Sequence, residues 1–171
     1  MNERFLTLPE IQRAAKRLLP PGTYGYGAGG AETETTLRRN RQALQKLVIR
    51  QRILVDVRNI DLTTTFLGMT LPMPIAIAPM GGIVVFHPQG DVEMARGAAS
   101  SGNLAVVSGV TGWPVEDVAK AAKGPLIFQL YFGGPRSWVQ ELLGRVEASG
   151  YRAVVLTVDL QKYGRRERDL H

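Results

Sequence analysis

Cysteine is absent from this 171-residue chain, and histidine occurs only as His87 and His171. Without cysteine the chain can form no disulfide or thiolate metal site, and it has no cysteine nucleophile. A metal site built from several histidines needs more of them than this sequence holds. We therefore expect no metal site.

Long apolar segments are also lacking. The longest one, from Ile75 to Phe86, is interrupted by Pro79, Gly81 and Gly82. A membrane-spanning helix needs about 20 apolar residues. The first residues, Met-Asn-Glu-Arg-Phe-Leu, lack the apolar core of a secretory signal. We expect a soluble, cytoplasmic protein without an integral membrane span.

The common nucleotide and nucleic-acid signals are missing as well. No G-x-G-x-x-G motif follows the first expected strand and no P-loop occurs, which disfavours NAD and nucleoside triphosphates as ligands. The net charge is +6, but the basic residues are scattered except at 38–41 and 165–168. We therefore expect no nucleic-acid partner, because a basic stripe is needed for one.

The residues that are present indicate a folded α/β protein. Hydrophobic residues make up 44% of the chain and charged residues 21%, which is a globular composition. Residues 1–70 are charged and mostly helical in pattern, with helices expected from Thr7 to about residue 19 and over 33–47. Between them, Tyr24–Gly30 is expected to be a flexible glycine-rich loop. Short extended pieces are expected at 53–57 and 63–67.

From about residue 71 the pattern alternates between strand and helix. Strands are expected at 75–78, 104–107, 126–131 and 153–158, and helices at 92–99, 114–122 and 137–147. Apolar strands that alternate with helices indicate a parallel sheet covered by helices. This pattern fits an open doubly wound sheet or part of a (β/α)8 barrel.

Polar groups lie at the end of each expected strand or directly after it. They are the turn 79–82, Ser108 with Gly109, Gln129 with Tyr131, and Thr157 with Asp159. Both architectures place functional residues at the carboxyl ends of the strands. These groups should therefore meet at one ligand-binding edge.

Six stretches carry a family resemblance over nearly the whole chain. They are Tyr24-Gly-Tyr-Gly-Ala-Gly-Gly-Ala31, Arg52-Ile-Leu-Val-Asp-Val57, Leu71-Pro-Met-Pro-Ile-Ala-Ile-Ala-Pro79, His87-Pro-Gln-Gly90, Phe128-Gln-Leu-Tyr131, and Leu156-Thr-Val-Asp159 with Gly164-Arg-Arg-Glu167. In this order they resemble the N-terminal half of the FMN-dependent 2-hydroxy-acid oxidases and dehydrogenases. The resemblance implies an α/β fold, the N-terminal half of a (β/α)8 TIM barrel of about four βα units, preceded by a helical N-terminal segment. Residues 1–70 would form that segment with lead-in strands, and 71–171 the first half of the FMN-binding barrel.

The resemblance also implies roles for individual residues. Tyr26 would bind the substrate carboxylate, Tyr131 would stabilise charge beside the hydroxyl-bearing carbon, and Arg166 would face the active site. Flavin contacts would come from the Ser108, Gln129 and Thr157 side chains and from the backbone of Pro79, Met80 and Gly81. Val110 stands where glycolate oxidases carry a tryptophan, which leaves room for a larger substrate. His87 matches a family position without a catalytic role.

The function that the resemblance implies is FMN-dependent oxidation of an L-2-hydroxy acid to a 2-oxo acid. In the family, the second half of the barrel supplies the base histidine, a substrate-binding arginine and a flavin-contacting lysine. The expected partners are therefore the small 2-hydroxy-acid substrate, that second half as a continuation or a separate chain, and further copies in a homo-oligomer such as a tetramer. The alternatives are an FMN oxidoreductase of the same fold with another substrate, such as a modified peptide, and a non-catalytic fragment that serves as an interaction module.

Overall fold

The computed structural model describes residues 5–160 and 162–170, which divide into two compact units. One unit contains the described residues up to Val55 together with those from Lys162 onward. The other begins at Asp56 and continues to residue 160. A functional division at residue 70 stays a prediction.

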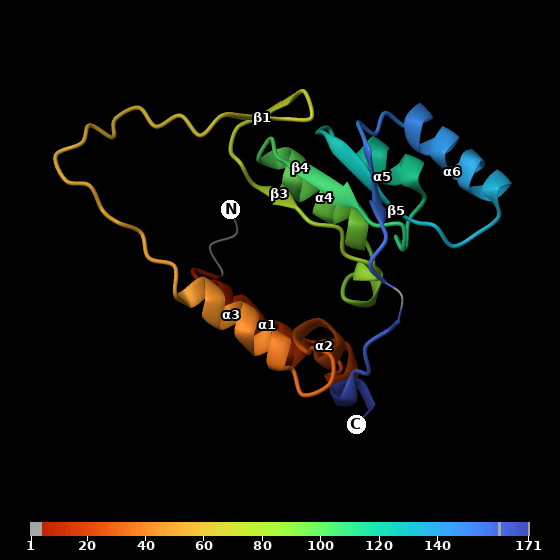
Figure 1. The fold of residues 1–171 in the computed structure, drawn as a ribbon, viewed down its shortest axis with the longest axis horizontal. Helices are drawn as coiled ribbons and strands as arrows, with labels where there is room; N and C mark the ends of the chain where they lie inside the picture. Colours follow the sequence, from red (N-terminus) through yellow and green to blue (C-terminus); the bar gives the residue numbers. More distant parts are fainter. Residues whose placement is uncertain (1–4, 161, 171) are drawn as a thin grey trace. The chain divides into compact units, whose positions relative to one another are not determined.

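Three helices and a 3-10 turn make up the first unit. They are α1 (Leu8–Leu18), α2 (Pro21–Ala28), α3 (Thr35–Gln45) and η2 (Glu167–Leu170) (Figure 1). The Glu10 carboxylate accepts the Thr7 backbone N–H at 3.2 Å, so the expected start of the first helix is confirmed.

The expectation of a loop at Tyr24–Gly30 is wrong for most of its length, because α2 covers it. Pro21 opens that helix, where the fixed φ of proline suits the first turn. The Tyr24 N–H donates to Pro20 O at 2.9 Å and the Gly29 N–H to Gly25 O at 2.8 Å. These backbone hydrogen bonds form a helix here despite the low helix propensity of its glycines.

A short antiparallel hairpin begins the second unit. It pairs β1 (Thr64–Phe66) with β2 (Met69–Leu71). Leu67 and Gly68 both have positive φ, of 47° and 74°, which is the backbone of a tight two-residue turn. The extended piece expected at 63–67 is thus confirmed in part, whereas 53–57, all described, forms no strand.

The expected alternation of strand and helix is confirmed. It runs β3 (Ala76–Ile77), η1 (Ile83–Val85), α4 (Gly90–Ser100), β4 (Leu104–Val107), α5 (Val115–Ala121), β5 (Leu126–Tyr131), α6 (Arg136–Ala148) and β6 (Val154–Thr157). The four strands are parallel and lie in the order β3-β4-β5-β6. A strand order that never reverses is that of a barrel, since a doubly wound sheet reverses at a switch point.

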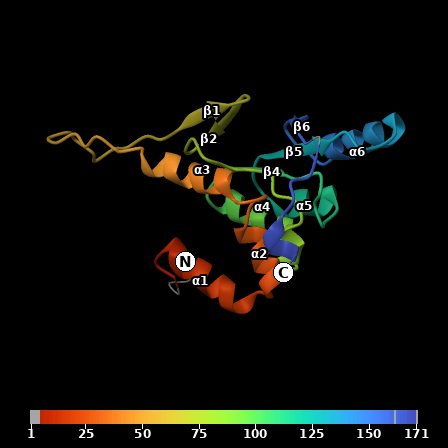
Figure 2. The same cartoon turned by 60° about the horizontal axis from the view of Figure 1, so that its bottom comes forward.

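Helices α4, α5 and α6 pack on one face of this sheet and the hairpin packs on the other. Figure 2 shows the hairpin apart from these three helices. Along β4, Ala105 and Val107 pack in the helical core, whereas Leu104 and Val106 pack with Met69 and Leu71 of the hairpin. This alternation is the period of two that a strand imposes. We call the side opposite the helices the inner face.

Tyr151 secures the helical layer against the sheet. Its hydroxyl donates to Val115 O at 3.0 Å, and its ring meets Phe128 edge to face at 6.0 Å. Burial, reinforced by the charges of Glu116 and Asp91, raises the pKa of this phenol. The hydroxyl therefore acts as a permanent hydrogen-bond donor. Within the described part of the chain, no helix is long and apolar enough to cross a bilayer.

Candidate active site

Strand register brings three predicted residues to the inner face. Phe128 faces the helical core, so its neighbour Gln129 points the other way. Ser108 continues the inner row of Leu104 and Val106 just beyond β4. Thr157 ends β6, two residues after Val155, which pairs with Gln129.

A buried hydrogen-bond chain joins these three side chains. Gln129 Oε1 accepts the Ser108 hydroxyl at 3.1 Å and the Gly109 backbone N–H at 3.0 Å. Gln129 Nε2 donates to Thr157 Oγ1 at 2.8 Å. Ser108 is 2% exposed and Gln129 is 3% exposed. Two donors on the oxygen fix the orientation of the amide, with its nitrogen toward Thr157.

The turn after β3 lies against the loop after β4. Gly82 has a φ of +67°, and its N–H donates to Val110 O at 3.1 Å. A Cβ added at Gly81 would lie 3.2 Å from Val110 Cβ, so glycine permits a close approach there. Pro79 and Met80 precede this contact and are exposed, as is the Val110 side chain. The structure thus brings the predicted backbone stretch 79–81 next to Val110.

Tyr131 ends β5 and pairs in register with Thr157. It is two residues from Gln129 on the same strand, so both belong to the inner row. Its side chain is partly exposed, in contrast to the buried Gln129. The substrate-directed role assigned to Tyr131 stays a prediction.

Tyr26 and Arg166 meet in the first unit. The Arg166 guanidinium carbon lies 4.6 Å from the centre of the Tyr26 ring, at cation–π distance. Its Nη2 donates to Tyr26 O and, at 3.3 Å, to Gly29 O. Nearby, Arg168 pairs with Glu34 at 2.8 Å. The basic run 165–168 is therefore an anchored segment in this unit, while the substrate-binding roles of Tyr26 and Arg166 stay predictions.

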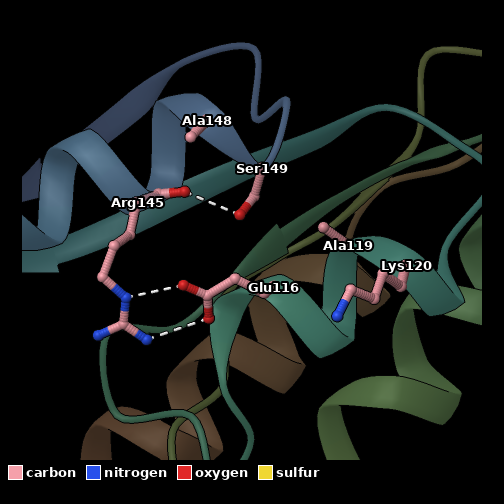
Figure 3. Close-up of a pocket in the computed structure, with 6 residues that line it drawn as sticks. All are labelled: Glu116, Ala119, Lys120, Arg145, Ala148 and Ser149. Atoms are coloured by element: carbon pink, nitrogen blue, oxygen red, sulfur yellow. Dashed lines mark hydrogen bonds and ion pairs between the residues drawn. The ribbon is translucent and has the colours of Figure 1, made fainter.

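A separate pocket of about 460 Å³ lies between α5 and α6 and contains none of the predicted site residues (Figure 3). Arg145 donates two hydrogen bonds to the Glu116 carboxylate there, of 2.7 and 3.0 Å. The Arg145 hydrogen bonds lower the pKa of the Glu116 carboxyl to about 2. The ion pair thus joins α5 to α6 beside this pocket, on the outer helical layer.

The sequence interpretation missed Asp91, in the first turn of α4. Its side chain is 0% exposed, and Oδ2 accepts the Gly112 N–H at 3.2 Å. Periodicity gives no signal for this residue, because an acidic side chain in a first helical turn is ordinarily a solvated favourable charge. The expected non-catalytic His87 is exposed, and its Nδ1 accepts the Gln89 N–H at 3.2 Å.

A parallel sheet with consecutive strand order, helices on one face and polar groups at the strand ends defines part of a (β/α)8 barrel with its ligand site at the carboxyl ends. The comparisons agree. Residues 15–171 match the model of the FMN-dependent dehydrogenase family. The chain belongs to the FMN-dependent dehydrogenase family.

Individual relatives are similar over nearly all of this chain. It is 44% identical over 161 residues to glycolate oxidase 1 of Zea mays, covering 94% of this chain and 44% of that protein. The corresponding identity to glycolate oxidase of Spinacia oleracea is 43%, with the same coverage.

Solved structures give the same result. A soluble mutant of the membrane-associated (S)-mandelate dehydrogenase from Pseudomonas putida matches with a TM-score of 0.91 and 34% identity, over 98% of this chain and 48% of that one. A mandelate oxidase matches with a TM-score of 0.90 and 32% identity, over 97% and 50%. The chain spans about half the length of these relatives, so it contains a partial barrel.

The buried cluster fits the FMN on which the family depends. An amide nitrogen has two hydrogens, and among the described residues Thr157 accepts one of those on Gln129. Thr157 receives that bond and keeps its own hydroxyl hydrogen to donate. The second amide hydrogen of Gln129 and the hydroxyl hydrogen of Thr157 both belong to groups on the inner face. The carbonyl oxygens and ring nitrogens of an isoalloxazine would accept them there. A polar group as deeply buried as the Gln129 amide needs such partners.

Proposed function

We propose that the protein containing this chain oxidises an L-2-hydroxy acid to a 2-oxo acid with FMN. The observation that carries the proposal is the Ser108–Gln129–Thr157 chain, placed at the strand ends of a member of an FMN-dependent family. Gln129 and Thr157 would hold the polar edge of the flavin ring. FMN, when bound, supplies the acceptor for the two electrons that leave C2 of the substrate.

Ser108 has a supporting part in this proposal. Its hydroxyl donates to Gln129 Oε1 and accepts the Val110 N–H at 3.1 Å. It therefore links the amide that would hold the ring to the loop that carries Val110. The exposed backbone of Pro79, Met80 and Gly81 would approach the ring from the adjacent turn.

The substrate would be held by residues whose roles come from the family resemblance. The Tyr26 hydroxyl and Arg166 would bind the carboxylate, and Tyr131 would donate to the oxygen on C2. Val110 would leave space for a side chain larger than that of glycolate. The proton of the substrate hydroxyl would pass to a histidine in the second half of the barrel, which residues 1–171 do not span.

Anaerobic reduction of the flavin tests this function. The complete polypeptide, purified with FMN, is mixed with a panel of L-2-hydroxy acids while its visible absorption is followed. Bleaching by L-2-hydroxy acids, but not by their D-enantiomers, is expected. Bleaching only by another class of compound, such as a modified peptide, would show that the substrate is of that class and not a 2-hydroxy acid. A colourless protein that takes up no FMN would indicate the non-catalytic module instead.

Partners and location belong to the same proposal. We propose a barrel completed by further polypeptide, assembled as a homo-oligomer in the cytoplasm. Relatives include a peroxisomal (S)-2-hydroxy-acid oxidase of Oryza sativa subsp. indica and the membrane-associated mandelate dehydrogenase. Gel filtration with mass spectrometry, and fractionation of cells, would test the assembly and the compartment separately.

A further inference from the structure

Asp91 is a fully buried carboxylate that no step of the proposed reaction uses. Its Oδ2 accepts the Gly112 N–H at 3.2 Å, and its Oδ1 has no hydrogen-bond partner among the described residues. Burying a polar group with so few partners is unfavourable. An apolar side chain would avoid that cost, but it could not accept the Gly112 N–H.

The carboxylate lies where three segments meet. Gly112 belongs to the loop after β4, and Asp91 to the first turn of α4. Between them lies Val84 of η1: a Cβ at Gly112 would clash with its side chain, and one at Gly90 would lie 2.9 Å from its backbone nitrogen. The Trp113 indole N–H adds a second link, to Pro88 O at 3.0 Å. The loop is therefore held beside the start of α4 by two hydrogen bonds, and the Val84 side chain packs against Gly112.

The loop after β4, which these hydrogen bonds hold, also contains Val110 of the candidate site. Val110 is two residues before Gly112, and its carbonyl accepts the Gly82 N–H at 3.1 Å. Its own N–H donates to Ser108 Oγ, which bonds Gln129. A displacement at Gly112 would thus reach Val110 through the two intervening backbone links, and the 79–82 turn through the Gly82 N–H to Val110 O bond.

We propose that Asp91 is a positioning residue, which sets the place of Val110 in the substrate pocket by holding the Gly112 N–H. This inference rests on the proposed function for its kinetic consequence, though not for its structural one. The chemistry required at position 91 is a buried acceptor of fixed length. Asparagine can supply such an acceptor, and alanine cannot.

The test compares Asp91→Ala and Asp91→Asn in the complete polypeptide loaded with FMN. Asp91→Ala should raise KM for bulky 2-hydroxy acids about tenfold to a hundredfold, the size expected for a small misplacement of a site group. It should also speed amide hydrogen exchange in the segment 110–112. Asp91→Asn should restore both readouts to nearly wild-type values. Asn103→Ala is the matched control, because Asn103 is also buried with an unpartnered oxygen and precedes β4 at its other end.

A purely structural role would make Asp91→Ala resemble Asn103→Ala, with a lower Tm and unchanged KM, and that result would overturn the proposal. The wild type provides a test that does not depend on a variant folding. Gly112 is exposed, yet its amide should exchange slowly; rapid exchange would also overturn the proposal. If no hydroxy acid reduces the flavin, the proposed function fails while the exchange measurements still decide the role of Asp91.

Discussion

At the scale of the residue, the buried amide of Gln129 concentrates the candidate flavin contacts. It is hydrogen-bonded at both ends, to Ser108 and Gly109 through its oxygen and to Thr157 through its nitrogen. A side chain held at three points loses little further freedom when a ligand binds it. Its removal should therefore affect the ligand directly.

Replacing Gln129 with leucine should weaken FMN binding by about 1–3 kcal/mol, because polar groups of the ring and of Thr157 would lose their partner. Titration of the apoprotein with FMN, followed by flavin fluorescence, measures this change. Gln140→Leu, on the exposed surface of α6, is the matched control and should bind FMN as the wild type does. Equal affinities in both variants would remove Gln129 from the flavin site.

The two site tyrosines should differ in their kinetic effects. Tyr26→Phe should mainly raise KM, since it removes a contact to the substrate carboxylate that is present before reaction. Tyr131→Phe should mainly lower kcat, if its hydrogen bond strengthens as charge develops on the substrate oxygen. Steady-state kinetics of both variants provide the measurement. Tyr163→Phe serves as the control because Tyr163 is 89% exposed. If the KM and kcat of both site variants equal those of this control, the assignments are contradicted.

At the scale of the element, α4 contains two glycines in opposite surroundings. A Cβ at Gly90 would lie 2.9 Å from Val84 N and 3.1 Å from Ile83 C, which are backbone atoms that cannot easily move away. A Cβ at Gly97 would meet nothing within 4 Å. Replacing each glycine with alanine therefore measures the effect of packing at Gly90 and the effect of helix propensity at Gly97.

Gly90→Ala should lower the free energy of unfolding by about 1–3 kcal/mol through overpacking. Gly97→Ala should raise it by about 0.5–1 kcal/mol, because alanine loses less backbone entropy than glycine in a helix. Urea unfolding of both variants measures the two effects. Similar changes of the same sign would show that the close contact between η1 and α4 does not constrain the helix.

At the scale of the whole molecule, the four-stranded sheet has two edges, β3 and β6. Val154, Val155 and Leu156 of β6 are each 44–50% exposed, although such apolar strand residues are ordinarily buried in a parallel sheet. A barrel removes its edges only by closing. The described part of the second unit therefore presents an open edge that further strands can cover.

Residues 1–171 expressed alone should accordingly not oxidise a 2-hydroxy acid. The open edges should also make the isolated segment prone to self-association, which gel filtration would reveal. The complete polypeptide, purified and assayed in parallel, is the control. A monodisperse, flavin-loaded and catalytically active species composed of residues 1–171 alone would contradict both the architecture and the site proposed here.

Much of the secondary structure of the second unit is set by residues close together in the sequence, so the sequence could predict it. Apolar runs such as Leu126–Tyr131 and glycines such as Gly102 and Gly150, both at positive φ, mark strand cores and helix ends without reference to distant residues. Strand ends follow from the same pattern, which is why Ser108, Gln129 and Thr157 could be selected as neighbours. The glycine-rich helix α2 escaped prediction, since its intrinsic propensity favours a loop.

The sequence by itself determined the alternation of strand and helix and the polar character of the strand ends, because both depend on spacing along the chain. The resemblance already implied a barrel, and the tertiary structure shows its unreversed strand order. Only the tertiary structure decided the bond between Asp91 and Gly112, which are 21 residues apart. It also decided which glycines must remain glycine, through the contacts of Val84 with Gly90 and Gly112. These features depend on surfaces that meet only after the elements pack, and no local pattern encodes which surfaces those are.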